Sequence, residues 1–402
     1  MEFKTDNGKL TIALEGEIDS CNAKAVGEEV GEILASHRQM PVVFDASGLH
    51  YISSAGLRVL LGVQKLKAPE KVTVQNLTRG IYEIFDETGF TDLMDVKRRV
   101  REIRLEGAKV IGEGQSSTVY RIDRETIVKL YKQGVPLAKI EQEKDFSKKA
   151  FVAGIPTVIS YDLVKCGDNY GAVFEMVDHA DTVGHTLTAH PDQFDSIMRK
   201  FVDAYRLIHH TNIEDMGGFV SLKDTWMRWA DGMQANGSFL PAECDMLRRM
   251  IDAIPERPTM VHCDFHAGNV MYQRDRIVVI DMADIGYGHP IFDLAGGAFH
   301  ARYSHFPTRQ KVHGMSQDGM LRFWYTLLRL YFNTDDEQRL EEIREMTSAF
   351  GLLRGALFPM KHVQIKPEVR DYHVAETRQH LFPRIDWAMD QVKRLDEFFG
   401  KE

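Results

Sequence analysis

The sequence predicts an α/β domain followed by an α+β domain of two lobes, a small lobe rich in strands and a large helical lobe. The length of 402 residues exceeds one ordinary domain of about 100–200 residues. Short strand-like and helical runs alternate at the N-terminus, whereas a later β-rich stretch gives way to mostly helical patterns. We therefore expect the α/β domain at 1–96, a linker at 97–107, the small lobe at 108–180 and the helical lobe at 181–402.

Three runs predict the α/β character of the first domain. Leu10 to Leu14 and Val42 to Phe44 are short apolar runs typical of strands, and a polar, alanine-rich helical run follows Asn22. The domain ends before the basic run VKRRVREIRLE at 96–106, which has little apolar periodicity. Such a run is typical of a solvated linker, and a docking site for an acidic partner is the alternative.

Two apolar stripes predict long helices in the last lobe. Their residues recur at three- and four-residue spacing, as expected for the buried faces of helices rather than for a cofactor site. They are Phe194, Ile197, Met198, Phe201, Val202, Tyr205 and Ile208, and Leu321, Trp324, Leu328 and Phe332.

The composition excludes several classes of protein. The formal net charge of -9, from 50 Lys+Arg against 59 Asp+Glu, gives nucleic acid no general electrostatic attraction. The 4 cysteines include no CxxC pair, so they suggest neither a disulfide framework nor a thiolate zinc site, and they fit a reducing cytoplasm. The N-terminus lacks a signal-peptide pattern, and no run of about 18 apolar residues could span a bilayer. We expect a cytoplasmic protein with no nucleic-acid partner and no membrane span.

The strongest chemical signal is the string HCDFHAGN at 262–269, followed by the hairpin-like VMYQRDRIVVI and then Asp281. The hairpin can return Asp264, Asn269 and Asp281 to one place. Phosphoryl transfer needs a carboxylate that orients the attacking hydroxyl and accepts its proton, which is the task expected of Asp264. It also needs oxygen ligands for Mg²⁺, here Asn269 and Asp281. The alternative is a polar loop whose Asp and Asn residues only make turns.

A glycine-containing turn precedes this string. Gly112 and Gly114 lie between two strand-like runs, with Ser116 and Ser117 in the same turn, and a further apolar strand leads to Lys129. Glycines let a backbone approach phosphates closely, and hydroxyls or amides of the turn can bond to them. An ammonium at the end of that strand could reach phosphate oxygens. The alternative is an ordinary hairpin that binds nothing.

A buried lysine usually requires a carboxylate partner. The helical segment KIEQEKDFSKKAF offers Glu143, with Glu141 as the second choice, because the phase of the helix decides which of them faces Lys129. The alternative for either residue is an exposed helix glutamate.

Residues from about 108 to 400 resemble the aminoglycoside and choline phosphotransferase group of the protein-kinase-like fold. That group's signature, His-Gly-Asp-x-His-x-x-Asn and then Ile-Asp, is seen here as HCDFHAGNV and VVIDMADIGYGHPIFDLA. The resemblance implies that Asp264 is catalytic and that Asn269 and Asp281 bind Mg²⁺. It also implies that Lys129 pairs with Glu143 and contacts the phosphates of ATP.

The resemblance extends to the residues around these groups. FEMV at 174–177 matches the hinge, where the backbone of Glu175 and Val177 would hold adenine. His262, His266 and Asp293 are implied to brace the catalytic loop, and Asp284 faces either the acceptor or solvent. Two positions depart from the pattern, because Cys263 replaces the usual glycine and Ser117 replaces the third glycine of the turn.

Residues 1–96 resemble a STAS domain, the fold of anti-sigma-factor antagonists. The resemblance rests on LEGEID around Asp19 and on VVFDASGLHYISSAGLRVLL. In that family a serine that opens a helix is phosphorylated by a partner kinase, and by position it is Ser54. A phosphate at a helix N-terminus is favoured by free N–H groups and the helix dipole. The alternative is that Ser54 only caps the helix. The resemblance implies a protein partner for this domain.

The sequence therefore predicts an ATP- and Mg²⁺-dependent phosphotransferase with a STAS regulatory or docking module. The acceptor is a hydroxyl of a small molecule, such as a sugar, an amino alcohol or an aminoglycoside-like compound, because no peptide-docking segment with an Ala-Pro-Glu-like ending follows Asp281. The alternatives are a protein serine kinase that acts on Ser54 or on a partner STAS domain, and a nucleotide-sensing pseudokinase. Acidic residues at 335–345 indicate either a cationic acceptor or a solvated helix face.

Overall fold

The computed structural model forms two compact units, Met1–Ile103 and Arg104–Glu402. It describes residues 1–6, 8–114, 116–178, 180–213, 217–304, 310, 312–361 and 365–400. Each unit has a hydrophobic core of its own.

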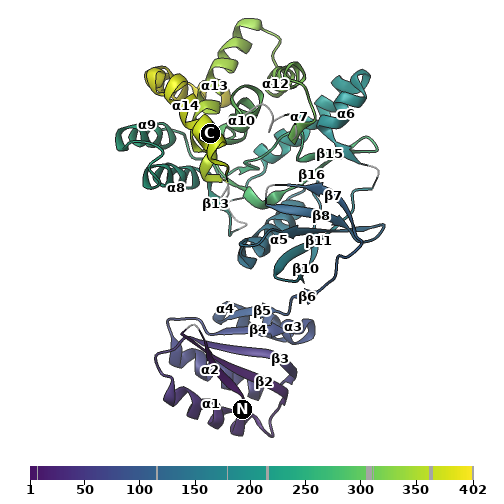
Figure 1. Cartoon of the computed structure of the whole chain (residues 1–402), viewed down its shortest axis with the longest axis vertical. Helices are drawn as coiled ribbons and strands as arrows, with labels where there is room; N and C mark the ends of the chain where they lie inside the picture. Colours follow the sequence, from purple (N-terminus) through teal and green to yellow (C-terminus); the bar gives the residue numbers. More distant parts are fainter. Residues whose placement is uncertain are drawn as a thin grey trace. The chain divides into compact units, whose positions relative to one another are not determined.

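The first unit is built on one sheet (Figure 1). Its elements are β1 (Phe3–Asp6), β2 (Lys9–Ile18), α1 (Ala23–Ser36), β3 (Val42–Ile52), α2 (Ser54–Lys67), β4 (Thr73–Leu77), α3 (Arg79–Glu87), α4 (Phe90–Leu93) and β5 (Asp95–Arg98). The sheet has the order β1-β2-β3-β4-β5, with β1 antiparallel to β2 and the other neighbours parallel. The α/β prediction for this part of the chain is confirmed.

Burial explains why these strands and helices form where they do. Leu10, Ile12 and Leu14 alternate toward the core along β2, and Val42 to Phe44 are buried in succession in the central strand β3. A Cβ atom at Gly56 would lie 2.7 Å from a side-chain carbon of Ile18. Only glycine therefore lets α2 begin so close to the end of β2.

The basic run predicted as a linker contains strand residues. β5 extends through Arg98, and Arg101–Glu102 form the short strand β6. The division between the two units follows Ile103. Backbone hydrogen bonding thus orders part of a segment whose side chains carry no apolar pattern.

The second unit begins with a small lobe of antiparallel strands and one helix (Figure 1). Its elements are β7 (Lys109–Glu113), β8 (Ser117–Arg121), β9 (Thr126–Tyr131), α5 (Leu137–Val152), β10 (Ser160–Cys166) and β11 (Asn169–Glu175). The strands follow the order β7-β8-β9-β11-β10. Ser117 at the start of β8 pairs with Tyr131 at the end of β9. The turn that joins β7 to β8 therefore lies next to the end of β9.

The remainder of the second unit is mostly helical. Its helices are α6 (Val183–Ala189), η1 (Pro191–Gln193), α7 (Phe194–His210), α8 (Leu222–Ala235), α9 (Pro241–Asp252), η3 (Met282–Asp284), α10 (Ile291–Ala298), η4 (Phe299–Tyr303), α12 (Gln317–Tyr331), α13 (Glu337–Lys361), α14 (Pro367–His380), η5 (Phe382–Arg384), α15 (Ile385–Lys393) and α16 (Leu395–Phe399). Its strands β12 (Asp181–Thr182), β15 (Val270–Gln273) and β16 (Arg276–Val279) form one small sheet, and β13 (Val220–Ser221), β17 (Gly286–Tyr287) and β14 (Met260–Val261) form another.

The predicted helical stripes form α7 and α12. The whole stripe from Phe194 to Ile208 is buried, and Trp324 and Leu328 lie in the same core. α13 passes through this core and is buried from Met346 to Pro359. Among the described helices, none combines the length and the apolar character needed to cross a membrane.

Candidate active site

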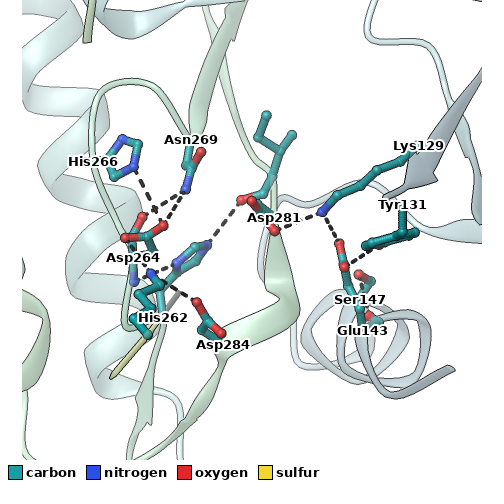
Figure 2. Close-up of polar contacts among 12 residues, drawn as sticks. Lys129, Tyr131, Glu143, Ser147, His262, Asp264, His266, Asn269, Asp281 and Asp284 are labelled. Atoms are coloured by element: carbon teal, nitrogen blue, oxygen red, sulfur yellow. Dashed lines mark hydrogen bonds and ion pairs between the residues drawn. The ribbon is translucent and has the colours of Figure 1, made fainter. Parts of the chain in front are cut away.

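Lys129 pairs with two carboxylates, one in its own small lobe and one in the helical lobe (Figure 2). It lies on β9, and its Nζ atom is 2.7 Å from Oε1 of Glu143 on α5 and 3.0 Å from Oδ1 of Asp281. Tyr131, two residues further along the strand and therefore on the same face, donates a hydrogen bond to the other oxygen of Glu143. The phase of α5 thus turns Glu143, rather than Glu141, toward Lys129.

This cluster keeps Lys129 charged. Its side chain is largely buried, and burial alone would lower the pKa of the ammonium group. The carboxylates of Asp281 and Glu143 more than compensate, so the pKa of Lys129 lies well above its usual value. A permanent positive charge is thereby held beside Asp281.

The predicted catalytic loop, which follows β14, is braced by Asp293. This buried residue of α10 accepts hydrogen bonds from the backbone amides of His262 at 2.9 Å and Cys263 at 2.6 Å. Its carboxylate also lies 3.0 Å from Nε2 of His209. The predicted bracing by Asp293 is confirmed. Cys263 has a φ of 65°, a left-handed conformation that glycine adopts without strain.

The hairpin β15–β16 returns the chain to the loop as predicted. The amide of Ile280 donates to the carbonyl of Asn269 at 2.9 Å, and Nε2 of His262 donates to the carbonyl of Ile280 at 3.2 Å. Asp281 follows directly, with a φ of 64°. Backbone strain of this kind is typical of functional sites. His262 therefore braces the loop against the strand that carries Asp281.

Asp264 and Asn269 lie side by side (Figure 2). The amide nitrogen of Asn269 donates to the backbone carbonyl of Asp264 at 3.1 Å and lies 3.3 Å from its Oδ2 atom. The amide oxygen of Asn269 is consequently the atom left to bind a cation. The donor set of that oxygen and the carboxylate of Asp281 fits Mg²⁺, which prefers oxygen ligands.

A second arrangement of ligand-type atoms also involves Asp264. Its carboxylate, His266 and His300 place one ligand atom each within 4.8 Å of one another. However, Nδ1 of His266 accepts a hydrogen bond from the amide of Gly268 at 3.0 Å, so the proton of the neutral ring is on Nε2, the atom that faces Asp264. A protonated nitrogen cannot ligate a metal. His266 is therefore better suited to orient Asp264 than to bind zinc.

Lys361 is the site residue that the sequence analysis missed. It ends α13, its side chain is 7% exposed, and its Nζ atom lies 2.8 Å from Oδ1 of Asp264 and 3.0 Å from Oδ2 of Asp284. Burial alone would raise the pKa of Asp264, but Lys361 and then His266 hold it well below its usual value. Asp264 is therefore ionised. Asp284, for which a position facing the acceptor or solvent was expected, shares Lys361 with Asp264.

The predicted nucleotide-contacting residues lie around β7, β8 and β11. Gly112 belongs to β7, Gly114 and Ser116 are exposed in the turn, and Ser117 is buried at the start of β8. Of the two hydroxyls, that of Ser116 is the accessible one. The lysine that follows β9, Lys132, donates to the carbonyl of Gly114 at 3.1 Å and supports the turn.

The predicted hinge follows β11, in which Glu175 is the last residue. The amide of Met176 donates to the carbonyl of Glu125 at 2.7 Å. Val177 packs against the core of the small lobe, together with Ile127 and Ile280. Apolar side chains from both lobes thus meet beside the hinge, as a planar aromatic base would require.

In the first unit, Ser53 and not Ser54 caps α2. The hydroxyl of Ser53 accepts hydrogen bonds from the amides of Ala55 at 3.2 Å and Gly56 at 3.4 Å. Ser54 is the first helical residue and is exposed. The idea that Ser54 serves only as the cap is therefore wrong, because its neighbour has that role.

Comparisons with known proteins identify both parts of the chain. A family model described as the phosphotransferase enzyme family matches residues 107–325. A second model, described as Mlab, STAS domain, matches residues 1–95. A curated protein of Bordetella bronchiseptica that is named as the anti-sigma factor antagonist BtrV is 33% identical over 92 residues, which are 22% of this chain and 78% of that protein. The predicted STAS and protein-kinase-like phosphotransferase domains are confirmed.

Solved structures resemble the chain at low sequence identity. A choline/ethanolamine kinase family protein from Mesorhizobium loti is 15% identical with a TM-score of 0.49, covering 71% of this chain and 92% of that one. APH(2″)-IIa in complex with gentamicin is 15% identical with a TM-score of 0.46, covering 76% and 97%. Choline kinase LicA from Streptococcus pneumoniae is 14% identical with a TM-score of 0.43, covering 77% and 99%.

Proposed function

Because the chain belongs to the phosphotransferase enzyme family and carries an N-terminal STAS domain, we propose that it transfers the γ-phosphoryl group of ATP to a hydroxyl of a small molecule. One observation carries the proposal. Lys129 contacts Asp281, the preceding residue Ile280 is hydrogen-bonded to Asn269, and Asn269 donates to Asp264. The groups that would hold phosphates, a cation and a hydroxyl thus form one connected set.

Asp264 would receive the acceptor. Its ionised carboxylate can accept a hydrogen bond from the hydroxyl, orient the oxygen and take its proton. The hydroxyl oxygen would bond to the γ-phosphorus as the bond from that phosphorus to the bridging oxygen of ADP breaks. The low pKa of Asp264 makes it a weak base, so orientation of the hydroxyl is its main contribution.

Lys129 and the turn after β7 would hold the phosphates. The charge of Lys129 is permanent, and Glu143 and Tyr131 prevent the side chain from turning away. The exposed backbone and hydroxyl of Ser116 could bind phosphate oxygens, whereas the burial of Ser117 leaves its hydroxyl less suited to that role. The backbone at Glu175 and Val177 would bind adenine.

Asn269 and Asp281 would hold Mg²⁺ through the amide oxygen and the carboxylate. When bound, the cation would neutralise negative charge on the transferred phosphoryl group. Asp281 is 43% exposed, which leaves it accessible to a hydrated cation that keeps several of its waters.

A protein acceptor is the second candidate, and one observation favours it. Ser54 is exposed at the start of α2 and is not needed as the cap, so its hydroxyl is available for modification. The STAS domain would then be a substrate. With a small-molecule acceptor, it would be a regulatory or docking module for a protein partner.

The test combines three measurements on the full chain. ATP with Mg²⁺ should raise Tm, since a ligand that binds only the native state stabilises it, and Asp281→Ala should abolish the Mg²⁺-dependent part. Release of ADP against a panel of hydroxylated small molecules tests for a small acceptor. Intact mass after incubation with ATP, compared with that of Ser54→Ala, tests for phosphorylation of Ser54. No shift in Tm at millimolar ATP and Mg²⁺ would overturn the nucleotide-dependent function.

A further inference from the structure

The ammonium group of Lys361 serves two carboxylates of the site at once. Its Nζ atom lies 2.8 Å from Oδ1 of Asp264 and 3.0 Å from Oδ2 of Asp284, and it is itself enclosed. The carboxylates are more accessible, because their side chains are 23% and 30% exposed against 7% for Lys361. A cation that belongs to the chain therefore occupies the place between the two carboxylates.

Packing of α13 holds this cation in place. The helix is buried from Met346 to Pro359, just before its last residue Lys361. Met360 packs against α8, where a Cβ atom at Gly232 would lie 2.3 Å from Cε of Met360. Burial alone would lower the pKa of Lys361, but the two carboxylates raise it, so the ammonium group stays charged.

A second buried cation of α13 lies near the catalytic loop. Arg354 is two turns before Lys361 and is 1% exposed. The centre of its guanidinium lies 5.9 Å from the ring centroid of Phe299, and the ring of the next residue, His300, lies 5.1 Å from that of His266 in the loop. The two cations of α13 equal the two carboxylates in number, so the local charges balance without a ligand.

The other three carboxylates described in the site also have partners within the chain. Asp281 and Glu143 share Lys129. Asp293 is 1% exposed and accepts hydrogen bonds from two backbone amides of the loop. Asp281 is also the residue proposed to hold Mg²⁺. None of the three is therefore available to bind a cationic group of an acceptor.

The acidic residues at 335–345 do not supply such a site either. The side chains of Asp335 and Glu341 are 84% and 66% exposed and pair with Arg329 and Arg344. They belong to a solvated face at the start of α13, which was one of the two expectations for them.

We propose that the acceptor is an uncharged polyol or sugar, and that Lys361 is the residue that excludes cationic acceptors such as amino alcohols and aminoglycosides. The inference rests on the proposed phosphotransferase function. The exposed side of Asp264 accepts a hydrogen bond from a neutral hydroxyl compound. An ammonium group of an acceptor would have to displace that of Lys361, or lie beside it and be repelled.

The first experiment compares acceptors of different charge on the full chain. Glucose, glucosamine and glucuronate share a pyranose ring and differ in charge, and glycerol and choline are smaller neutral and cationic alcohols. ADP release is measured with each compound in the presence of ATP and Mg²⁺. Turnover of a neutral compound should exceed that of its charged analogue by on the order of tenfold or more. Turnover of glucosamine or choline at or above that of glucose or glycerol would overturn the inference.

The second experiment measures Tm and does not require the acceptor to be among these compounds. Lys361→Met leaves the two carboxylates without their cation, so choline and glucosamine should bind the variant on the order of tenfold more tightly than the wild type and raise its Tm further. Sodium chloride at the same low ionic strength is the reference, because salt screens exposed charges. Lys366→Met replaces an exposed lysine shortly after α13 and should respond as the wild type does.

Two further variants separate charge from stability. Lys361→Gln removes the charge but keeps an amide that can donate a hydrogen bond to one carboxylate, so it should show the same gain in cation binding even where Lys361→Met folds poorly. Lys361→Arg keeps the positive charge and should show no gain.

Two results of the Tm series would overturn the inference. One is a response to choline and glucosamine that is equal in the wild type and in both uncharged variants. The other is stabilisation of the wild type by either cation beyond that by sodium chloride. The response of Tm to ATP with Mg²⁺ in the same series judges the proposed function separately: its presence beside an unchanged cation response would reject this inference alone.

Discussion

The ammonium group of Lys361 lies 2.8 Å from Oδ1 of Asp264, although the two residues are far apart in the chain. This contact joins the end of α13 to the catalytic loop. It holds the pKa of Asp264 low, and a second contact at 3.0 Å ties Asp284 to the same ammonium. The charge of the predicted catalytic carboxylate therefore depends on a residue outside the catalytic string.

Lys361→Met should move the acidic limb of the pH–rate profile to higher pH. Lys361 lowers the pKa of Asp264, so without it the carboxylate becomes protonated, and inactive, at a pH where the wild type is still ionised. The profile is obtained from ADP release across a pH series. Lys366→Met replaces an exposed lysine of the same stretch and should leave the profile unchanged. Superimposable profiles for Lys361→Met and the wild type would contradict the prediction.

Asp264→Asn should lower turnover by on the order of a hundredfold or more while nucleotide binding survives. The amide keeps the shape of the side chain but cannot accept the proton of the hydroxyl. Turnover is measured by ADP release and nucleotide binding by the shift in Tm. Asp275→Asn, at the exposed turn of the hairpin, is the matched control. Turnover near that of the control would mean that another residue orients the acceptor.

Cys263 should be chemically inert and replaceable by glycine. Its thiol is buried with a pKa of about 12, so iodoacetamide should label the exposed Cys21 in the native protein and Cys263 only after denaturation. Because Cys263 has a φ of 65°, Cys263→Gly should retain turnover on the order of the wild-type value. Peptide mass spectrometry and ADP release are the measurements. Rapid native labelling of Cys263 would show that the loop opens.

Ser53→Ala should destabilise the start of α2, and Ser54→Ala should not. The hydroxyl of Ser53 accepts two amide hydrogen bonds, and loss of such a cap costs about 1 kcal/mol. Hydrogen–deuterium exchange of the first amides of α2 should therefore be roughly fivefold faster in Ser53→Ala. Equal protection in the two variants would show that the cap contributes nothing measurable.

The elements of the fold and the order of the site residues could be predicted from the sequence, because both depend on neighbouring residues. Apolar spacing predicted α7 and α12. The hairpin after the string from His262 to Asn269 predicted that the chain returns to Asn269 directly before Asp281. These signals are local, since helical periodicity and hairpin turns act over a few residues. The alternative in which Ser54 only caps the helix missed the cap by one residue, because adjacent serines satisfy the same local rule.

The contacts between remote residues of the site were decided only by the tertiary structure, because they depend on which distant elements pack together. The phase of α5 against β9 selected Glu143 over Glu141, and the packing of α13 against the catalytic loop brought Lys361 to Asp264. By itself, the sequence determined the two domains and their order. It could not reveal the lysine on Asp264, because a side chain gains a counter-charge from a remote segment only when the two segments are buried against one another.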